Sequence, residues 1–275
     1  MKKLVISIIF LSCLFSTFFA NAQTEKMAEY WDDVDFSDTA LVSSQAFRDR
    51  LIDYLYQFTN ADEKSYDSLT INGLDIVLKR AKANMRVYEF VLELALNGYT
   101  GMGRSMVTDY LLNYPQLAEG EITMEEGLRL DSITEPYQKV RVGAKAPDYS
   151  DVTMDGKPYR LYDSEAKNII VFFWSTDCEY CHDFLNQIRK KLDLKTDFEL
   201  ITFALADNEQ EAKSALRKMR LPGYHFYDDS RWEGKAFMVY HVTSTPTVFV
   251  LDENKMIVCK PYDWEELKEW LKSNK

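Results

Sequence analysis

The chain of 275 residues contains few histidines and cysteines, three and four, and these are common residues of metal centres and catalytic sites. Residues 23–142 contain neither type, no glycine-rich phosphate loop after a strand, and no pairing of carboxylate with histidine. The glycines of residues 98–103 lie between predicted helices and lack the lysine and serine that complete a phosphate loop. This half of the sequence therefore indicates no recognisable catalytic chemistry.

Basic residues are fewer than acidic residues. The chain has 33 basic against 44 acidic residues, a net charge of -11. We therefore expect no nucleic acid partner and no attraction to anionic lipid, and interpret the acidity as a solubilising surface. A composition of 46% hydrophobic and 28% charged residues is typical of a globular protein with a real core, and the length fits two domains.

Long apolar runs are absent after residue 22, so no later segment is expected to span a bilayer. At the start, Lys2 and Lys3 precede an apolar stretch, and residues 20–22 read Ala-Asn-Ala, with small residues where signal peptidase cleaves. We expect residues 1–22 to be a signal peptide cleaved after Ala22, which makes the protein exported and periplasmic. Lipidation of Cys13 and an uncleaved membrane anchor are the alternatives.

Cleavage would remove Cys13 and leave Cys178, Cys181 and Cys259. One close pair and one single thiol in an exported protein favour a working disulfide over a structural framework. We interpret the single thiol, Cys259, as a small apolar residue buried in a strand.

The cysteine pair lies at a junction between a strand and a helix. Residues 169–174 form an apolar run rich in β-branched and aromatic side chains, which predicts a buried strand. Phe184, Ile188 and Leu192 then recur at steps of four, so a helix begins at or just before Cys178. The N-terminal end of a helix favours thiolate, and two thiols separated by two residues can close and reopen a disulfide. The pattern predicts thiol-disulfide exchange.

Residues 23–142 have the pattern of an all-α domain. The first predicted helix is capped by Ser43 or Ser44, and further helices are expected over residues 65–83, from residue 85 to the Asn97-Gly98 pair, and over residues 104–113. Their apolar faces predict a small bundle. The sequence does not identify the role of this domain or a partner for it.

Residues 143–275 have the pattern of an α/β fold. A hairpin is expected around Asp155-Gly156, and the strand before the cysteines and the helix after them are followed by a strand over 198–206 and a helix over 208–220. Strands over 246–251 and 256–259 and a helix over 264–272 close the chain. This order predicts a central mixed sheet with helices on both faces.

Three separated motifs carry a resemblance to a known family: WSTDCEYC at residues 174–181, APD at 146–148 with the DGK hairpin at 155–157, and TPT at 245–247. Together they resemble the thioredoxin superfamily, and within it the exported TlpA and ResA type. The resemblance covers about residues 143–275. The helical segment in front is similar to an uncharacterised domain that precedes thioredoxin-like modules in some secreted bacterial proteins.

The resemblance implies roles for individual residues. Cys178 would attack a partner disulfide and Cys181 would resolve the mixed disulfide. Pro246 would follow a cis peptide bond and face the cysteines, Thr245 would offer its backbone to an extended substrate, and Trp174 would pack behind the cysteines as part of the substrate site. The resemblance further implies protein thiols or disulfides as substrates, a membrane electron donor, and no cofactor.

The sequence departs from the family pattern near the cysteines. Phe172 occupies the place of the buried acid of many thioredoxins, so His182 and Glu179 become candidates for proton transfer at Cys181. The carboxylates of Asp177 and Glu179 flank Cys178 and disfavour its thiolate. We therefore hypothesise a moderately reducing couple.

Other uses of the same cysteines remain open. The pair followed by His182 matches the attachment motif of c-type haem, and a zinc site would need further ligands. A peroxiredoxin would have proline and threonine where this chain has Val171 and Ser175. A non-catalytic binding or scaffold protein with a thioredoxin-like module is the alternative function.

Overall fold

The computed structural model describes residues 25–57, 63–114, 122–194 and 197–274, with the backbone alone for residues 63–65. The predicted signal peptide and Cys13 lie outside these residues. The chain separates into two compact units, residues 1–96 with 118–129 and residues 97–117 with 130–275. The expected domain boundary at residue 143 stays a prediction. Within the described ranges, every helix is too short or too polar to cross a membrane.

Helices make up the regular structure before residue 143, as the sequence predicts. They are α2 (Gln45–Tyr56), α3 (Glu63–Ala81), α4 (Met85–Gly101), α5 (Ser105–Asn113) and α6 (Met124–Gln138), with a 3-10 helix η1 (Thr39–Ser43) before α2. Ser44 caps α2 by accepting a hydrogen bond from the Phe47 amide at 3.2 Å, which confirms one of the two predicted caps.

The predicted end of α4 at Asn97-Gly98 is wrong, because the helix continues to Gly101. Tyr99 is 1% exposed and extends the buried stripe of the helix by another turn, so its packing outweighs the weak helix propensity of Gly98. The chain turns at Gly103, which has a φ of 67° that glycine adopts without steric cost.

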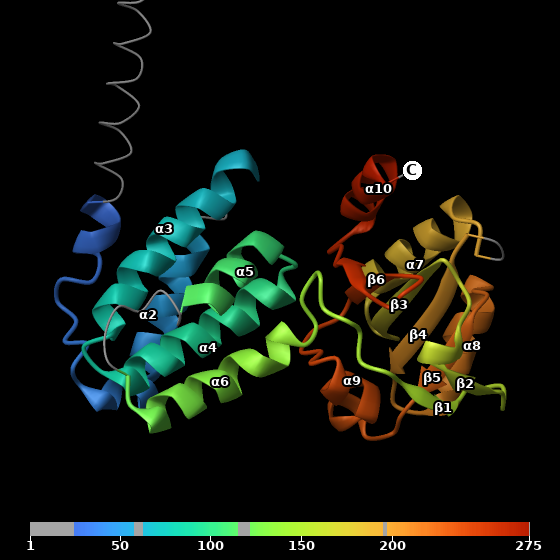
Figure 1. Cartoon of the computed structure of the whole chain (residues 1–275), viewed down its shortest axis with the longest axis horizontal. Coiled ribbons are helices and arrows are strands. Elements are labelled where there is room, and N and C mark those ends of the chain that lie inside the picture. Colours follow the sequence, from blue (N-terminus) through green and yellow to red (C-terminus); the bar gives the residue numbers. More distant parts are fainter. Residues whose placement is uncertain (1–24, 58–62, 115–121, 195–196, 275) are drawn as a thin grey trace, which may run out of the picture. The chain divides into compact units, whose positions relative to one another are not determined.

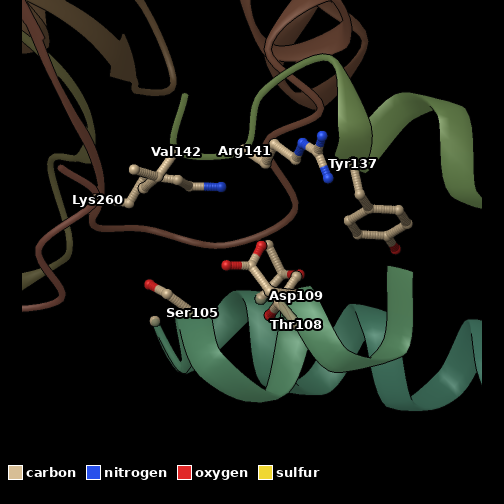
Figure 2. Close-up of a pocket in the computed structure, with 9 residues that line it drawn as sticks. Ser105, Thr108, Asp109, Tyr137, Arg141, Val142 and Lys260 are labelled. Atoms are coloured by element: carbon tan, nitrogen blue, oxygen red, sulfur yellow. The ribbon is translucent and has the colours of Figure 1, made fainter. Parts of the chain in front are cut away.

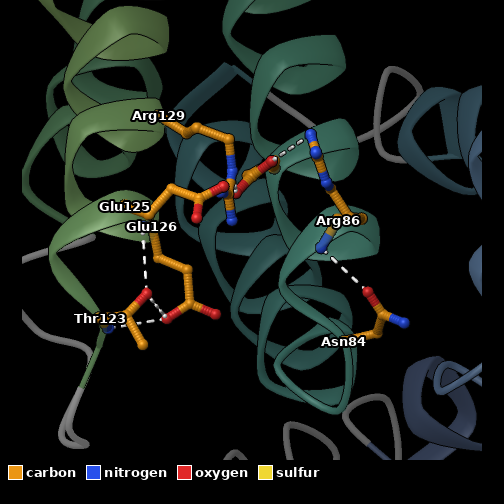
Figure 3. Close-up of polar contacts among 7 residues, drawn as sticks. Asn84, Arg86, Thr123, Glu125, Glu126 and Arg129 are labelled. Atoms are coloured by element: carbon orange, nitrogen blue, oxygen red, sulfur yellow. Dashed lines mark hydrogen bonds and ion pairs between the residues drawn. The ribbon is translucent and has the colours of Figure 1, made fainter.

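Helix α6 is a helix that we did not predict, although its start carries a sequence signal (Figure 3). The Thr123 amide and hydroxyl donate to the Glu126 carboxylate at 2.7 and 2.8 Å, and the Glu126 amide donates back to the hydroxyl at 3.3 Å. This is a capping box, readable as Thr-x-x-Glu. One turn later, Arg129 forms ion pairs of 2.7 Å with Glu125 and with the nearly buried Glu89 of α4, so the helix is fixed at its first two turns.

A five-stranded mixed sheet organises the rest of the chain, in the order β5-β4-β3-β6-β7 (Figure 1). The strands are β3 (Asn168–Ser175), β4 (Glu199–Leu205), β5 (Tyr224–Tyr227), β6 (Thr247–Asp252) and β7 (Ile257–Cys259). β3, β4 and β5 are parallel, whereas β6 and β7 are antiparallel to their neighbours. The predicted hairpin forms a separate two-stranded sheet of β1 (Ser150–Val152) and β2 (Pro158–Arg160).

Helices cover both faces of the large sheet, which confirms the predicted layering. They are α7 (Glu179–Lys191), α8 (Glu209–Met219), α9 (Lys235–Val239) and α10 (Trp264–Ser273). On one face, Phe173 packs with Phe237 of α9; on the other, Phe172 packs in a cluster that holds side chains of α7, α8 and α10. Successive side chains of the buried strand β3 thus pack alternately into the two apolar layers.

The register of β3 with β6 determines where the functional segments meet. Phe172 lies opposite Val248 and Phe173 opposite Thr247, in an antiparallel pair. The end of β3 therefore lies beside the start of β6. The residues that follow β3, including both cysteines, are brought next to the residues that precede β6.

We predict that Phe173→Ala lowers the free energy of unfolding by about 3–5 kcal/mol, because it empties a fully buried site. The Phe173 ring stacks on Phe203 with 4.8 Å between centroids. Chemical denaturation measures the change. Val152→Ala, at a position 58% exposed, is the control and should change the free energy by no more than about 0.5 kcal/mol. Equal small effects of both substitutions would contradict the packing described.

Candidate active site

Cys178 and Cys181 are joined by a disulfide, with their Cα atoms 5.2 Å apart. Cys178 is the residue that caps α7, and the backbone amide of Cys181 donates a hydrogen bond to its sulfur at 3.1 Å. The helix therefore begins at Glu179, one residue after the predicted start. The Cys181 amide and the positive end of the helix dipole form an environment that stabilises negative charge on the Cys178 sulfur when the disulfide is reduced.

The two sulfurs differ in their access to solvent. Cys178 is half-buried, whereas Cys181 is completely buried in the apolar cluster beneath α7. A large partner can reach the first sulfur and not the second. This asymmetry distinguishes an attacking cysteine from a resolving one.

Thr245 and Pro246 lie beside the disulfide, as the register of β3 and β6 requires. The peptide bond between them is cis, as the resemblance implies. The Thr245 carbonyl oxygen is 4.0 Å from the Cys178 sulfur. An extended chain that approached this sulfur would therefore pass the Thr245 backbone.

Trp174 is completely buried and packs in the same cluster as Cys181. It lies in the core behind the cysteines, where it supports them and does not face solvent. Phe172 is buried there too, with its ring 5.3 Å from that of Phe184, so an apolar ring occupies the place of the buried acid.

The two candidates for proton transfer lie in different surroundings. Glu179 is exposed at the first turn of α7. His182 is half-buried with its ring 5.7 Å from that of Trp174, and its Nε2 atom is buried without a hydrogen-bond partner in the described part of the chain. Of the two, His182 has the nitrogen enclosed by protein.

A pair of tyrosines beside the cysteines escaped the sequence analysis. Tyr180, inside the cysteine motif, is 46% exposed, and its ring centroid lies 6.0 Å from that of Tyr262, which is 39% exposed. Burial raises the pKa of Tyr180, and Asp263 adds to the rise. Tyr262 precedes α10, far from the motif in sequence, and no local pattern marks it.

Cys259 is half-buried at the end of β7. Burial raises the pKa of its thiol to about 12, and the Glu266 carboxylate adds to the rise. The thiol therefore stays protonated near neutral pH and is a poor nucleophile, which agrees with its interpretation as a small apolar residue.

The part of the chain that the structure describes has no arrangement of side chains that supports a metal or haem site. No three histidine, cysteine, aspartate or glutamate side chains among those residues are grouped to hold a metal ion. The two sulfurs bond to each other, and the His182 ring packs toward Trp174.

Comparisons with known proteins cover this site. Residues 142–260 match the model of the AhpC/TSA family. The chain is 24% identical over 141 residues, 49% of this chain and 79% of the relative, to "Thiol-disulfide oxidoreductase ResA" of Bacillus thuringiensis subsp. konkukian. It is 25% identical over 121 residues, 43% of this chain and 69% of the relative, to "Thioredoxin-like protein YneN" of Bacillus subtilis.

A solved structure resembles a larger part of the chain. The crystal structure of a thioredoxin-like protein from Bacteroides caccae is 17% identical, covers 92% of this chain and 93% of its own, and has a TM-score of 0.56. This likeness extends over the helices as well as the sheet. The predicted fold is thereby confirmed: the chain has a thioredoxin-like fold in which helices precede the mixed-sheet domain.

Proposed function

We propose that this protein is an exported thiol-disulfide oxidoreductase that reduces disulfides of other proteins through Cys178 and Cys181. The observation that carries the proposal is the accessible sulfur of Cys178, which lies at the start of α7, bonded to the buried Cys181 and beside Thr245. The names of the relatives support the same chemistry. Export rests on the sequence of residues 1–22, and the thiols are restored by a dithiol donor at the membrane.

The reaction begins with both cysteines reduced. The Cys178 thiolate attacks one sulfur of the partner disulfide, whose S-S bond breaks, and a mixed disulfide forms as the first partner thiolate leaves. Cys181 then loses its proton and attacks the Cys178 sulfur, which releases the second partner thiolate. The enzyme ends with the disulfide seen in the structure, and two electrons have passed to the substrate.

Two opposing effects set the strength of this reductant. The Cys181 amide, 3.1 Å from the Cys178 sulfur, and the start of the helix stabilise the thiolate. Asp177 and Glu179 oppose it, although both are exposed and screened by solvent. We propose a moderately reducing couple, in which His182 accepts the proton of Cys181 in place of the absent buried acid.

The alternative functions lack a supporting observation of this kind. A scaffold protein would not need an accessible sulfur bonded to a buried one. A peroxidase would place proline and threonine before Cys178, where the chain has Val171 and Ser175. Thiol-disulfide exchange therefore remains the proposal.

We predict that Cys178→Ser lowers the rate constant for reduction of a protein disulfide by roughly a thousandfold, because the attacking sulfur is lost. Cys181→Ser should instead accumulate a mixed disulfide with the substrate, visible on a non-reducing gel. Cys259→Ser is the matched control and should keep the rate of the native chain. Loss of activity in Cys259→Ser alone would contradict the assignment.

The flanking carboxylates lead to a second prediction. Removing their charge in Asp177→Asn/Glu179→Gln should stabilise the Cys178 thiolate and raise the reduction potential by roughly 10–20 mV, because exposed charges are strongly screened. Glutathione titration measures the potential. Glu253→Gln is the control for loss of negative charge, because Glu253 follows the end of β6 that lies away from the cysteines. A potential that falls in the double variant would refute the electrostatic explanation.

A further inference from the structure

We propose that the turn between α4 and α5, residues 101–104, forms part of the substrate-binding surface and selects polypeptide disulfides. The inference rests on the proposed function and adds to it the element that recognises the substrate. Residues 97–117 belong to the same compact unit as the cysteines, so the turn and the site are placed together.

The turn contacts two loops that adjoin Cys178. A Cβ atom built on Gly101 would lie 3.3 Å from the hydroxyl oxygen of Ser244, the residue before Thr245. A Cβ atom on Gly103 would lie 2.5 Å from the Cβ atom of Tyr262. At Gly103 only glycine allows the backbone to approach so closely, and at Gly101 a larger residue would be tight.

Each contacted residue is connected to the cysteine turn through one neighbouring residue. Ser244 precedes Thr245, whose carbonyl oxygen is 4.0 Å from the Cys178 sulfur. Tyr262 pairs with Tyr180, which lies between the two cysteines in sequence. The turn thus links the proline loop to the tyrosine pair.

Neighbouring residues hold the turn in place. The Tyr137 hydroxyl donates a hydrogen bond of 2.8 Å to Asn97 of α4, and the Tyr137 ring lies edge-on to His241 at 4.3 Å between centroids. His241 precedes the proline loop by a few residues. The base of the turn is therefore anchored to the segment that leads to Thr245.

Helix α5 faces Lys260, the residue after β7, across a small cavity (Figure 2). Asp109, Arg141 and Lys260 line a cavity of about 30 Å³, room for one or two water molecules and not for a substrate. Burial lowers the pKa of Lys260 to about 8, and Asp109 opposes the change. The opposite charges of Asp109 and of Arg141 and Lys260 attract across the cavity, which favours the position of α5 beside the loop of Tyr262.

This geometry predicts which substrates depend on the turn. A small disulfide reaches the Cys178 sulfur without extending beyond it. A polypeptide that runs along the Thr245 backbone extends to the turn and to the exposed rings of Tyr180 and Tyr262. An apolar side chain of the polypeptide, close to the substrate cysteine, can pack against these rings. The turn therefore discriminates between disulfides by size and apolar character.

The test compares the pre-reduced full chain in single-turnover reactions with insulin and with hydroxyethyl disulfide. Gly103→Ala must displace the turn, since its Cβ atom would overlap Tyr262. We expect the ratio of the insulin rate constant to the small-disulfide rate constant to fall by about tenfold. Gly143→Ala is the matched control, because Gly143 also has a positive φ of 86° but its added Cβ atom meets nothing within 4 Å; its ratio should stay that of the native chain.

Gly101→Ala supplies a second, milder test that needs only a small shift of the Ser244 hydroxyl, and it decides the question if Gly103→Ala does not fold. A lower ratio in Gly101→Ala or Gly103→Ala, with an unchanged ratio in Gly143→Ala, supports the inference. An unchanged ratio in the folded variants overturns it. Failure of the native chain to reduce either disulfide would instead refute the proposed function.

Discussion

The antiparallel pairing of β3 with β6 is the constraint on which the rest of this site depends. It places the residue after one buried strand beside the residue before another, so that the cysteine turn and the Thr245-Pro246 bond meet at one edge of the sheet. Both strands are almost completely buried between two apolar layers, and a shift of register by one residue would move every side chain of a strand into the opposite layer. Packing of the core thus fixes the geometry of the chemistry.

Burial also gives the two sulfurs different access to a partner protein. The same apolar cluster that stabilises α7 encloses Cys181 and leaves Cys178 partly open. At the helix start, the Cys181 amide then donates a hydrogen bond to the more open sulfur. A single feature, a helix that is capped by Cys178 and packs on β3, therefore accounts for the access and the electrostatics that the proposed order of reaction needs.

The sequence predicted those parts of the fold that local pattern determines. The strand before the cysteines, the start of α7 and the two closing strands each have a periodic or capped sequence of their own, and the structure has each of them within one residue of the predicted bounds. The end of α4 was wrong because burial of Tyr99 outweighed the local signal of Gly98. Helix α6 was missed even though Thr123 and Glu126 form a readable capping box.

The missed residues of the site have a different cause. Tyr262, Ser244 and Gly103 come from three loops far apart in the chain, and only the folded backbone brings them together. A close approach of glycine to a side chain leaves no periodic trace in a sequence. Residues defined by the chemistry of a motif could be found by pattern, whereas residues defined by tertiary contact could not.

The reduction potential of the Cys178 and Cys181 pair tests the central claim most directly. Titration of the native chain against glutathione or dithiothreitol, with Cys178→Ser as the blank, measures it. A reversible couple near about -270 mV, the value of thioredoxin, is the result predicted for a moderately reducing pair. A value near about -120 mV would indicate an oxidant, and the absence of any reversible couple would contradict the proposed chemistry altogether.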